Sequence, residues 1–335
     1  MKKWIWLVVV LGIALLVISG KYIFEKPQPI DTILVETPQQ KLEAAVSSPE
    51  VSSQRLLADI QNLNFQRYTD AELERTRNYI ITELRKSGWT PKLEKFAEGI
   101  NVVAERVGTD KKAGKILVGA HYDSVFQSPG ADDNASGVAV VLEVARLLGE
   151  ATPRTLELVL FDKEEAGLLG SRAFAAKKTH LKDLQGVIVM DMVSYACYTP
   201  GCQKYPTGLP IKPPSDKGDF LAVIGDTEHL PLLNSFQQNI QENAQLPVVL
   251  TVPIPLKGLL TPDTLRSDHA PFWYQGVGAV LVTDTANLRT PHYHKPSDIP
   301  NTIDRNFFTG AAQIVVNTTK KLLHSIDLNT PKLTT

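Results

Sequence analysis

The sequence has only two cysteines in 335 residues, and its charges almost cancel. Two cysteines exclude a cysteine-rich zinc module and a framework of several disulfides, so a metal ion would be held mainly by histidines and carboxylates. The 35 Lys and Arg against 36 Asp and Glu leave a formal net charge of −1, which argues against broad electrostatic attachment to nucleic acid. We find no internal repeat and no glycine-rich phosphate loop. With 43% hydrophobic and 21% charged residues, the composition is that of a globular protein.

An uncharged apolar run lies at the N-terminus, from Trp4 to Gly20, directly after Lys2 and Lys3. A basic pair followed by such a run is typical of an export signal or a short membrane span. Because no small-residue cleavage site follows, we interpret residues 1–24 as an uncleaved signal anchor, with a cleaved signal peptide as the alternative. The lysines would stay in the cytoplasm. The rest of the chain would then lie outside it, anchored to the membrane or exported to the periplasm or the extracellular space.

Residues 25–50 are rich in Pro, Gln, Ser and Thr, which is typical of a linker. From about residue 50, helical and strand-like patterns alternate, and residues 51–328 are predicted to form a single domain. A capping box at Thr69 and Glu72 predicts a helix that ends near Gly88. Apolar segments predict strands at 101–107, 115–120, 155–161, 186–190, 220–224, 248–252 and 279–282. Strands separated by helices predict an α/β fold with helices on both faces of the sheet.

The segment from Tyr195 to Ser215 contains many prolines and turn residues, and it is predicted to be a long loop. Both cysteines, Cys197 and Cys202, lie in this segment. In an oxidising compartment they could form a disulfide, and two free thiols are the alternative.

Histidines and carboxylates follow four of the predicted strands. In an open α/β sheet, ligands bind at the carboxyl ends of the strands, so these side chains are candidates for one site. Buried carboxylates repel one another unless a cation neutralises them. Nitrogen and oxygen ligands without cysteine suit zinc and permit cobalt or manganese. The candidates are His121, Asp123, Asp132, Asp133, Asp162, Glu164, Glu165, Asp191, His292 and His294.

The order of these segments resembles the bacterial dizinc aminopeptidases, which belong to a large peptidase family that includes aminopeptidase Y and the secreted leucyl aminopeptidases. Five pieces carry the resemblance: H-x-D at 121–123, G-A-D-D-N-A-S-G at 130–137, E-E-x-G-L-x-G-S at 164–171, D-M at 191–192 and H-x-P-x-D at 294–298. The resemblance extends from about residue 52 to 325. It implies a zinc-dependent exopeptidase fold, with a mixed, mostly parallel central sheet.

The resemblance implies two Zn²⁺ ions per chain. One ion would be held by His121, Asp133 and Asp191. The other would be held by Asp133, Glu165 and His294, with Asp133 bridging the two. His292 is an alternative to His294, but His294 fits the H-x-P-x-D motif and is therefore preferred.

Two further residues have roles that the resemblance implies. Glu164 would be the general base, and Asp123 would accept a hydrogen bond from the His121 imidazole and fix its orientation. The family also implies a cis peptide bond between Asp133 and Asn134. Asp132 and Asp162 are predicted to be structural or solvated rather than metal ligands.

The implied activity is hydrolysis of the N-terminal peptide bond of peptides with a free N-terminus, by a monomer. The alternatives are a glutaminyl cyclase, which shares the fold and uses one zinc ion for acyl transfer, and a non-catalytic membrane-anchored scaffold. A dipeptide carboxypeptidase of the same family would usually carry an inserted protease-associated domain. Only twenty residues separate Asn101 from His121, which leaves no room for one.

Several other residues are candidates for the substrate cleft. Lys163 and Lys295 would place positive charge near it, or they could be solvated. The stretch 267–272 resembles the family and could line the substrate pocket, or it could cap a helix with a buried aromatic side chain. Three tyrosines of the long loop could contact the reacting group, and the sequence does not choose among Tyr195, Tyr198 and Tyr205.

Overall fold

The computed structural model describes residues 48–206, 215–237 and 246–325. These residues belong to one compact unit that begins at Ser48. The predicted signal anchor and most of the predicted linker lie outside the described residues. Within the described ranges, we find no helix that is both long and apolar enough to cross a membrane.

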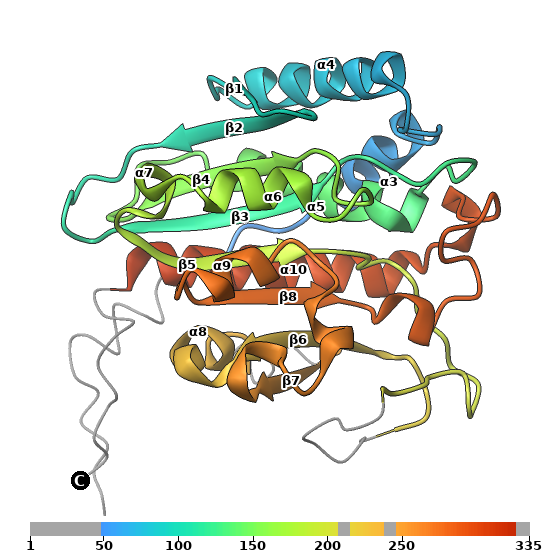
Figure 1. Cartoon of the computed structure of the whole chain (residues 1–335). Helices are drawn as coiled ribbons and strands as arrows, with labels where there is room; N and C mark the ends of the chain where they lie inside the picture. The colour runs from blue at the N-terminus through green and yellow to red at the C-terminus, as the bar shows by residue number, and fades with distance from the viewer. Residues whose placement is uncertain (1–47, 207–214, 238–245, 326–335) are drawn as a thin grey trace, which may run out of the picture. The chain divides into compact units, whose positions relative to one another are not determined.

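The described residues form an eight-stranded sheet in the order β1-β2-β4-β3-β5-β8-β6-β7 (Figure 1). The strands are β1 (Lys92–Lys95), β2 (Ile100–Arg106), β3 (Lys115–His121), β4 (Thr155–Phe161), β5 (Leu184–Met190), β6 (Phe220–Asp226), β7 (Val248–Ile254) and β8 (Ala279–Thr283). The pairs β3–β4, β3–β5, β5–β8 and β6–β7 are parallel, and the pairs β1–β2, β2–β4 and β6–β8 are antiparallel. The predicted mixed, mostly parallel sheet is confirmed.

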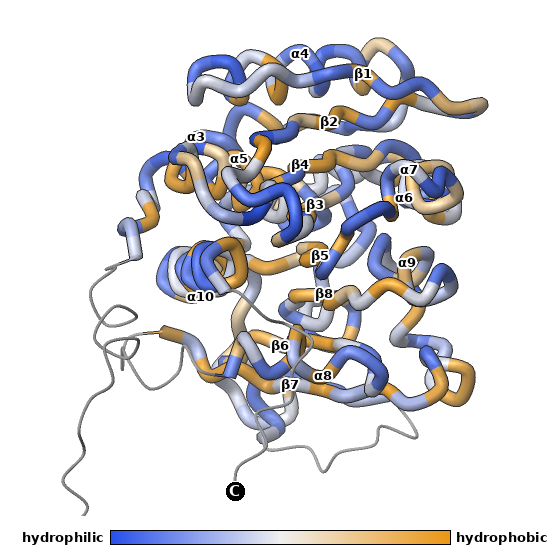
Figure 2. Tube along the Cα trace, turned by 90° about the vertical axis from the view of Figure 1, so that its left-hand side faces the viewer, coloured by the Kyte–Doolittle hydropathy of each residue, from blue (hydrophilic) through white to orange (hydrophobic). Residues whose placement is uncertain are grey.

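Helices cover both faces of this sheet, as predicted (Figure 2). The helices α3, α5 and α10 lie on one side, and α6, α7 and α9 lie on the other. Their bounds are α3 (Ser53–Asn62), α4 (Asp70–Lys86), α5 (Gly137–Leu147), α6 (Leu169–Ala175), α7 (Lys178–Leu181), α8 (Leu230–Asn234), α9 (Ala270–Tyr274) and α10 (Arg305–His324). The predicted capping box is present at the start of α4, where Thr69 and Glu72 cap each other's backbone.

The two faces of the sheet belong to two separate hydrophobic clusters. Along β3, Ile116 and Val118 point into the cluster shared with α3, α5 and α10, whereas Leu117 points into the cluster shared with α6 and α9. This alternation follows from the two-residue period of a strand. Because both faces are covered, the central strands are apolar on both sides, which is why they are recognisable in the sequence as continuous apolar runs.

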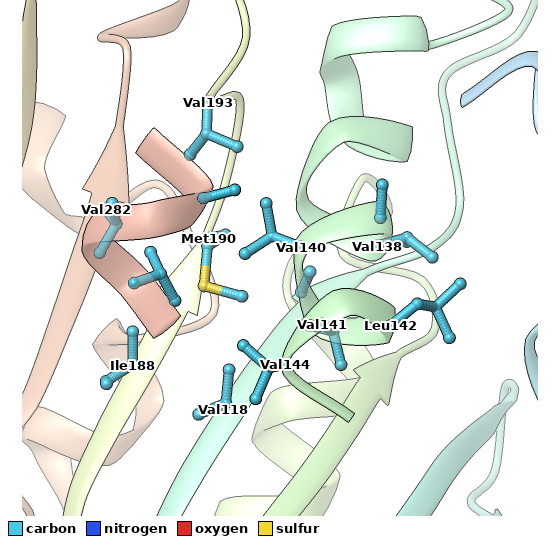
Figure 3. Close-up of a cluster of buried hydrophobic side chains, with 14 of the residues drawn as sticks. Val118, Val138, Val140, Val141, Leu142, Val144, Ile188, Met190, Val193 and Val282 are labelled. Atoms are coloured by element: carbon cyan, nitrogen blue, oxygen red, sulfur yellow. The ribbon is translucent and has the colours of Figure 1, made fainter. Parts of the chain in front are cut away.

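Helix α5 is buried along most of its length. Every residue from Gly137 to Ala145 is buried. Figure 3 shows Val140 beside Met190 of β5, and Val144 beside Val118 of β3. Each fully buried side chain of this size stabilises the fold by roughly 1.5–3 kcal/mol. This packing fixes the helix, and with it the polar loop that immediately precedes it.

The structure also decides two points of local structure. Strand β1 was not predicted, because its sequence Lys-Leu-Glu-Lys is mostly exposed and lacks an apolar run. It forms an edge strand on β2. Cys197 and Cys202, whose pairing the sequence left open, form a disulfide.

A buried acid in the helical layer should make the stability of the protein depend on pH. Asp59 of α3 is only 7% exposed and accepts a hydrogen bond from the Tyr79 hydroxyl at 2.5 Å. Burial raises its pKa from 3.8 to about 6, and the nearby Glu83 and Glu143 act in the same direction, against the hydrogen bond from Tyr79 and the charge of Arg55. Between these pH values the folded protein binds more protons than the unfolded chain. Stability is therefore lost as the pH rises through this window and stays lower above it.

We therefore expect Asp59→Asn to raise the free energy of unfolding at pH 8 by up to about 3 kcal/mol and to leave it nearly unchanged at about pH 3, below both pKa values. Asparagine keeps the acceptor for Tyr79 and removes the buried charge. Urea unfolding of the metal-free protein at both pH values measures the difference, with the exposed Glu74→Gln on α4 as the control. Equal stability of the variant and the wild type at pH 8 would contradict this account.

Candidate metal centre

Predicted site residues follow four strands of the sheet and meet where these strands have their carboxyl ends. Strand β3 ends at His121, and Glu164 and Glu165 follow β4 by a short turn. Asp191 follows β5 directly, and His294 comes from the segment after β8. Strands β3, β4, β5 and β8 run in the same direction, so their carboxyl ends meet at this edge, where open α/β sheets bind ligands.

The side chains of this edge form two overlapping groups with the spacing of metal ligands. Ligand atoms of His121, Asp133 and Asp191 all lie within 4.8 Å of one another, and so do those of Asp133, Glu165 and His294. Asp133 belongs to both groups. Its Oδ1 lies 3.4 Å from His121 Nε2, and its Oδ2 lies 3.2 Å from His294 Nε2. The two oxygens of one carboxylate thus face two different histidines.

The electrostatics of the cluster favour a bound cation. Burial opposes ionisation of Asp133, yet hydrogen bonds with His121 and His294 hold its pKa below the ordinary value. Although burial lowers the pKa of His294, its hydrogen bonds with Asp133 and Glu165 raise that pKa to about 10. Burial and Asp133 together raise the pKa of Glu165 to about 7. The carboxylates therefore draw positive charge into the cluster.

Asp133 is held by a loop of unusual backbone, residues 130–136, which we call the Asp133 loop. The peptide bond from Asp133 to Asn134 is cis, as the resemblance implied. Gly130 has a φ of 60°, and a Cβ there would lie 2.1 Å from the Asp133 carbonyl oxygen and 2.6 Å from an Arg67 nitrogen. Only glycine fits this position. The Asn134 side chain donates to the Met190 carbonyl at 2.9 Å, which joins the loop to the end of β5.

Two buried side chains, those of Arg67 and Asp298, form hydrogen bonds with the backbone at the Asp133 loop. Arg67 is fully buried and donates to the carbonyls of Gly130 and Pro129. Asp298 is 1% exposed, and its two oxygens accept from the backbone N–H groups of Asp132, at 2.9 Å, and Asp133, at 3.0 Å. Sequence analysis missed Arg67 entirely and used Asp298 only as part of a motif. The H-x-P-x-D motif was the one signal that pointed to Asp298.

Asp123 lies beside His121: His121 Nδ1 is 3.3 Å from the Asp123 backbone carbonyl oxygen, with which it forms a hydrogen bond, and 3.4 Å from Asp123 Oδ1. It also has a second set of contacts that the sequence did not reveal. Its two oxygens accept from the backbone N–H groups of Glu164, at 3.1 Å, and Glu165, at 3.2 Å. Asp123 therefore joins the end of β3 to the segment after β4. It orients both an imidazole and the Glu-Glu pair.

Glu164 lies within the cluster but belongs to neither three-residue group. Its side chain is 7% exposed and lines the cavity beside the cluster. Burial raises its pKa well above the ordinary value, and the carboxylates of Asp191 and Asp268 act in the same direction. A carboxyl group with a raised pKa, next to candidate metal ligands but not among them, suits proton transfer.

A cavity of about 490 Å³ opens beside the cluster. Its apolar lining comes mainly from β6, β7 and β8, and includes Ile224, Leu250, Val252 and Leu281. Alternate residues of β6 and β7 line the cavity, so one face of these two strands borders it. Both strands run antiparallel to β8, and their carboxyl ends therefore lie away from the metal cluster. Such a cavity, with an apolar lining and convergent polar groups, is typical of a small-molecule or peptide-binding site.

Other predicted residues divide between the cavity and its surroundings. Ser267 lines the cavity, while Phe272 of the same stretch is buried in α9, so the two interpretations of this stretch both hold in part. Of the three loop tyrosines, Tyr205 lines the cavity, whereas the Tyr198 hydroxyl donates to Asp304. His292 lies outside both groups and contacts Ser297 at 3.0 Å.

The remaining candidates have structural contacts. Asp132 Oδ1 accepts from the Ser194 backbone and hydroxyl. Asp162 accepts from the backbone of Ile100 at 2.9 Å. Lys295 donates to the Pro291 carbonyl at 2.6 Å. Neither Lys163 nor Lys295 is among the described residues that line the cavity, although each directly adjoins a residue that does, Glu164 and His294 respectively.

The donor set fits zinc. Imidazole nitrogens and carboxylate oxygens, with no cysteine, are a common zinc ligand set, and each group offers three protein ligands. Glu165 Oε1 is buried without a hydrogen-bond partner among the described residues. Its other oxygen, Oε2, lies 3.2 Å from His294 Nε2, and a bound cation would give the unpaired Oε1 a partner.

Comparisons with known proteins point to one peptidase family. The model of peptidase family M28 matches residues 101–319. The uncharacterised protein YfbL of Escherichia coli K12 is 34% identical over 230 residues, which are 64% of this chain and 68% of that protein. Leucine aminopeptidase 1 of Trichophyton equinum is 30% identical over 220 residues, which are 60% of this chain and 52% of that protein. This chain thus spans about half the length of that relative.

Solved structures show the same fold. An aminopeptidase from Aneurinibacillus sp. strain AM-1 superposes with a TM-score of 0.63 at 16% identity, covering 84% of this chain and 97% of that one. Porphyromonas gingivalis glutaminyl cyclase superposes with a TM-score of 0.60 at 19% identity, covering 81% and 98%. At these identities the likeness concerns the fold alone. The family model, however, matches more than half of the chain, and the chain therefore belongs to peptidase family M28.

Proposed function

We propose that this protein is a metal-dependent aminopeptidase that binds two zinc ions and hydrolyses the first peptide bond of substrates with a free N-terminus. His121, Asp133 and Asp191 would hold one ion, and Asp133, Glu165 and His294 the other. The observation that carries the proposal is the placement of Asp133, whose two oxygens face two different histidines. Family membership and the fungal leucine aminopeptidase relative support the reaction type.

When bound, the two ions would polarise the scissile carbonyl and acidify a water molecule. The chain's own residues would do the rest. Glu164, as general base, would take a proton from the attacking water and pass it to the leaving amine. Asp123 contacts the backbone of Glu164 and the ring of His121, and it would therefore keep the general base and this metal ligand in position relative to each other. The apolar lining of the cavity would receive the first side chain of the substrate and exclude water around it.

Export of the protein is part of this proposal. The Cys197–Cys202 disulfide is the kind of bond that persists in oxidising compartments, outside the cytoplasm. The basic pair and apolar run of residues 1–24 agree with this and would keep the protein at the membrane if they are not cleaved. Substrates would then be exported or external peptides, and a monomer would suffice for activity because every proposed ligand comes from one chain.

Metal removal tests the proposal. We expect that dialysis of the full-length chain against a chelator lowers hydrolysis of aminoacyl-p-nitroanilides more than a hundredfold and lowers the melting temperature, because a ligand that binds only the folded state stabilises it. Zinc should restore both, with saturation at two ions per chain by mass spectrometry under native conditions. Full activity without metal would rule out the proposal.

A glutaminyl cyclase is the second candidate, because one of the structures with the same fold has that activity. The same preparation should therefore be tested on peptides with N-terminal glutamine. Saturation at one zinc ion, with cyclisation of glutamine and no hydrolysis of other peptides, would favour the cyclase. Two bound ions and release of free N-terminal amino acids favour the aminopeptidase.

A further inference from the structure

The lining of the cavity beside the metal cluster includes more cationic than acidic side chains once the cluster itself is set aside. Three cationic side chains line it, Arg172, Lys204 and Arg266, and outside the cluster the only acidic residue among the described lining residues is Asp263. If two zinc ions balance the carboxylates of the cluster, the rest of the lining keeps an excess of positive charge. An excess of this kind favours substrates that carry an anionic group close to the scissile bond.

Arg266 differs from an ordinary surface arginine because its guanidinium is held in place. One Nη donates to the Asn287 side chain at 3.0 Å, and the other donates to the Tyr293 hydroxyl at 2.9 Å. Both partners are neutral and both line the cavity. In the ranges that the structure describes, none of the ion pairs includes Arg266. Its charge is therefore fixed in position and not neutralised, with further N–H donors available.

Arg266 also lies close to the proposed centre of reaction. Its guanidinium carbon is 5.7 Å from the centre of the Tyr293 ring, and that ring stacks on the His294 ring with 3.7 Å between centroids. One tyrosine ring thus separates Arg266 from a proposed metal ligand. Consecutive Cα atoms of a peptide are about 3.8 Å apart, so a substrate of two or three residues is long enough to span this separation.

The apolar and the cationic side chains of the lining suit different parts of a substrate. The apolar side chains of β6, β7 and β8, among them Leu250 and Leu281, suit the first side chain of a peptide. The fixed guanidinium suits a carboxylate, because arginine binds carboxylates through paired, charge-assisted N–H···O bonds. A short peptide supplies such a carboxylate at its C-terminus, and a longer peptide has only neutral amides at the same distance from its first bond.

We propose that Arg266 binds the C-terminal carboxylate of short peptides and so makes di- and tripeptides the preferred substrates. The proposal rests on the proposed aminopeptidase function and names its substrate class. Arg266 acts in substrate binding and not in the bond-breaking step. Its loss should therefore reduce the discrimination between substrates that have the carboxylate and those that lack it.

The test compares Leu-Leu with its amide, Leu-Leu-NH₂, on the full-length zinc-loaded protein. We expect the wild type to favour the free acid about tenfold in kcat/KM, and Arg266→Gln to bring this ratio close to one. Arg266→Lys, which keeps the charge but loses the paired geometry, should give an intermediate ratio. Arg172→Gln is the matched control, because it removes another cation from the same cavity, and it should lower the ratio by less than about twofold through the smaller positive charge alone.

A further pair of substrates distinguishes the source of the carboxylate. Leu-Asp-NH₂ and Leu-Asn-NH₂ differ only in an acidic side chain at the second residue. If Arg266 discriminates within this pair but not between Leu-Leu and its amide, it binds an acidic side chain and the proposal is wrong. A wild-type ratio of one for Leu-Leu against its amide, or a ratio that falls in Arg172→Gln and not in Arg266→Gln, would also overturn it.

A binding measurement separates this inference from the proposed function. Calorimetric titration of Leu-Leu and Leu-Leu-NH₂ into Glu164→Gln protein reads affinity without turnover. We expect tighter binding of the free acid, and loss of that difference when Arg266→Gln is added. Absence of hydrolysis in the wild type would defeat the aminopeptidase proposal, whereas equal hydrolysis and equal binding of acid and amide would defeat only the role of Arg266.

Discussion

Glu164→Gln should lower kcat for peptide hydrolysis by about three orders of magnitude, while the zinc content stays at the wild-type level. Glutamine has nearly the same size as glutamate, but it cannot take a proton from water at neutral pH. The backbone N–H of Glu164, which donates to Asp123 at 3.1 Å, is unchanged, so the segment should keep its position. Steady-state kinetics on aminoacyl-p-nitroanilides, with metal analysis of the same samples, measures both quantities.

The neighbouring Glu165→Gln is the matched control, because it changes the same chemical group one residue away. Glu165 Oε2 lies 3.2 Å from His294 Nε2, within a candidate ligand group, and Glu164 belongs to no such group. We therefore expect Glu165→Gln to weaken zinc binding more than tenfold and to recover activity when zinc is added in excess. If Glu164→Gln lost its metal and Glu165→Gln kept it, the assignment of the two glutamates would be reversed.

The sheet and the two ligand groups could be predicted because their signals are local. Each central strand is an apolar run buried on both faces, and β4, for example, has the predicted bounds of Thr155 and Phe161. The candidate ligands follow the strand ends in motifs of a few residues. The rule that parallel strands expose their carboxyl ends at one edge brings His121, Asp191 and the Glu-Glu pair together without further information.

The features that the sequence did not reveal depend on contacts between distant segments. Arg67 lies in a turn with no motif around it, and only the fold places the carbonyl of Gly130, 63 residues away, within 2.8 Å of its guanidinium. The cationic side chains that line the cavity are a second feature that the sequence did not reveal. The sequence left Lys163 and Lys295 either near the cleft or solvated and did not single out Arg266, which lines the cavity because the segment after β7 returns to the site.

Asp298 shows why a motif residue that contacts no ligand atom can still be required. It lies four residues after His294, and its two oxygens accept from the backbone of Asp132 and Asp133. One carboxylate therefore joins the segment of one proposed ligand to the loop of the bridging ligand. The buried guanidinium of Arg67 donates to the Pro129 and Gly130 carbonyls of this region. Burial lowers the pKa of Arg67, and the charge of Asp298 acts against this. The loop is thus held through both its N–H and its C=O groups.

Asp298→Asn should lower the affinity for zinc by about ten- to a hundredfold, the range found when groups that orient metal ligands are removed. The amide keeps one acceptor oxygen but turns an NH₂ group toward a backbone N–H, so either Asp132 or Asp133 loses its hydrogen bond. Excess zinc should restore much of the lost kcat, because all five proposed ligands remain. Zinc titration in a competing chelator measures the affinity, and urea unfolding of the metal-free protein separates this effect from general destabilisation. Ser297→Ala, an exposed neighbour, is the control and should bind zinc like the wild type. If Asp298→Asn unfolds more easily but binds zinc unchanged, Asp298 stabilises the fold and does not position Asp133.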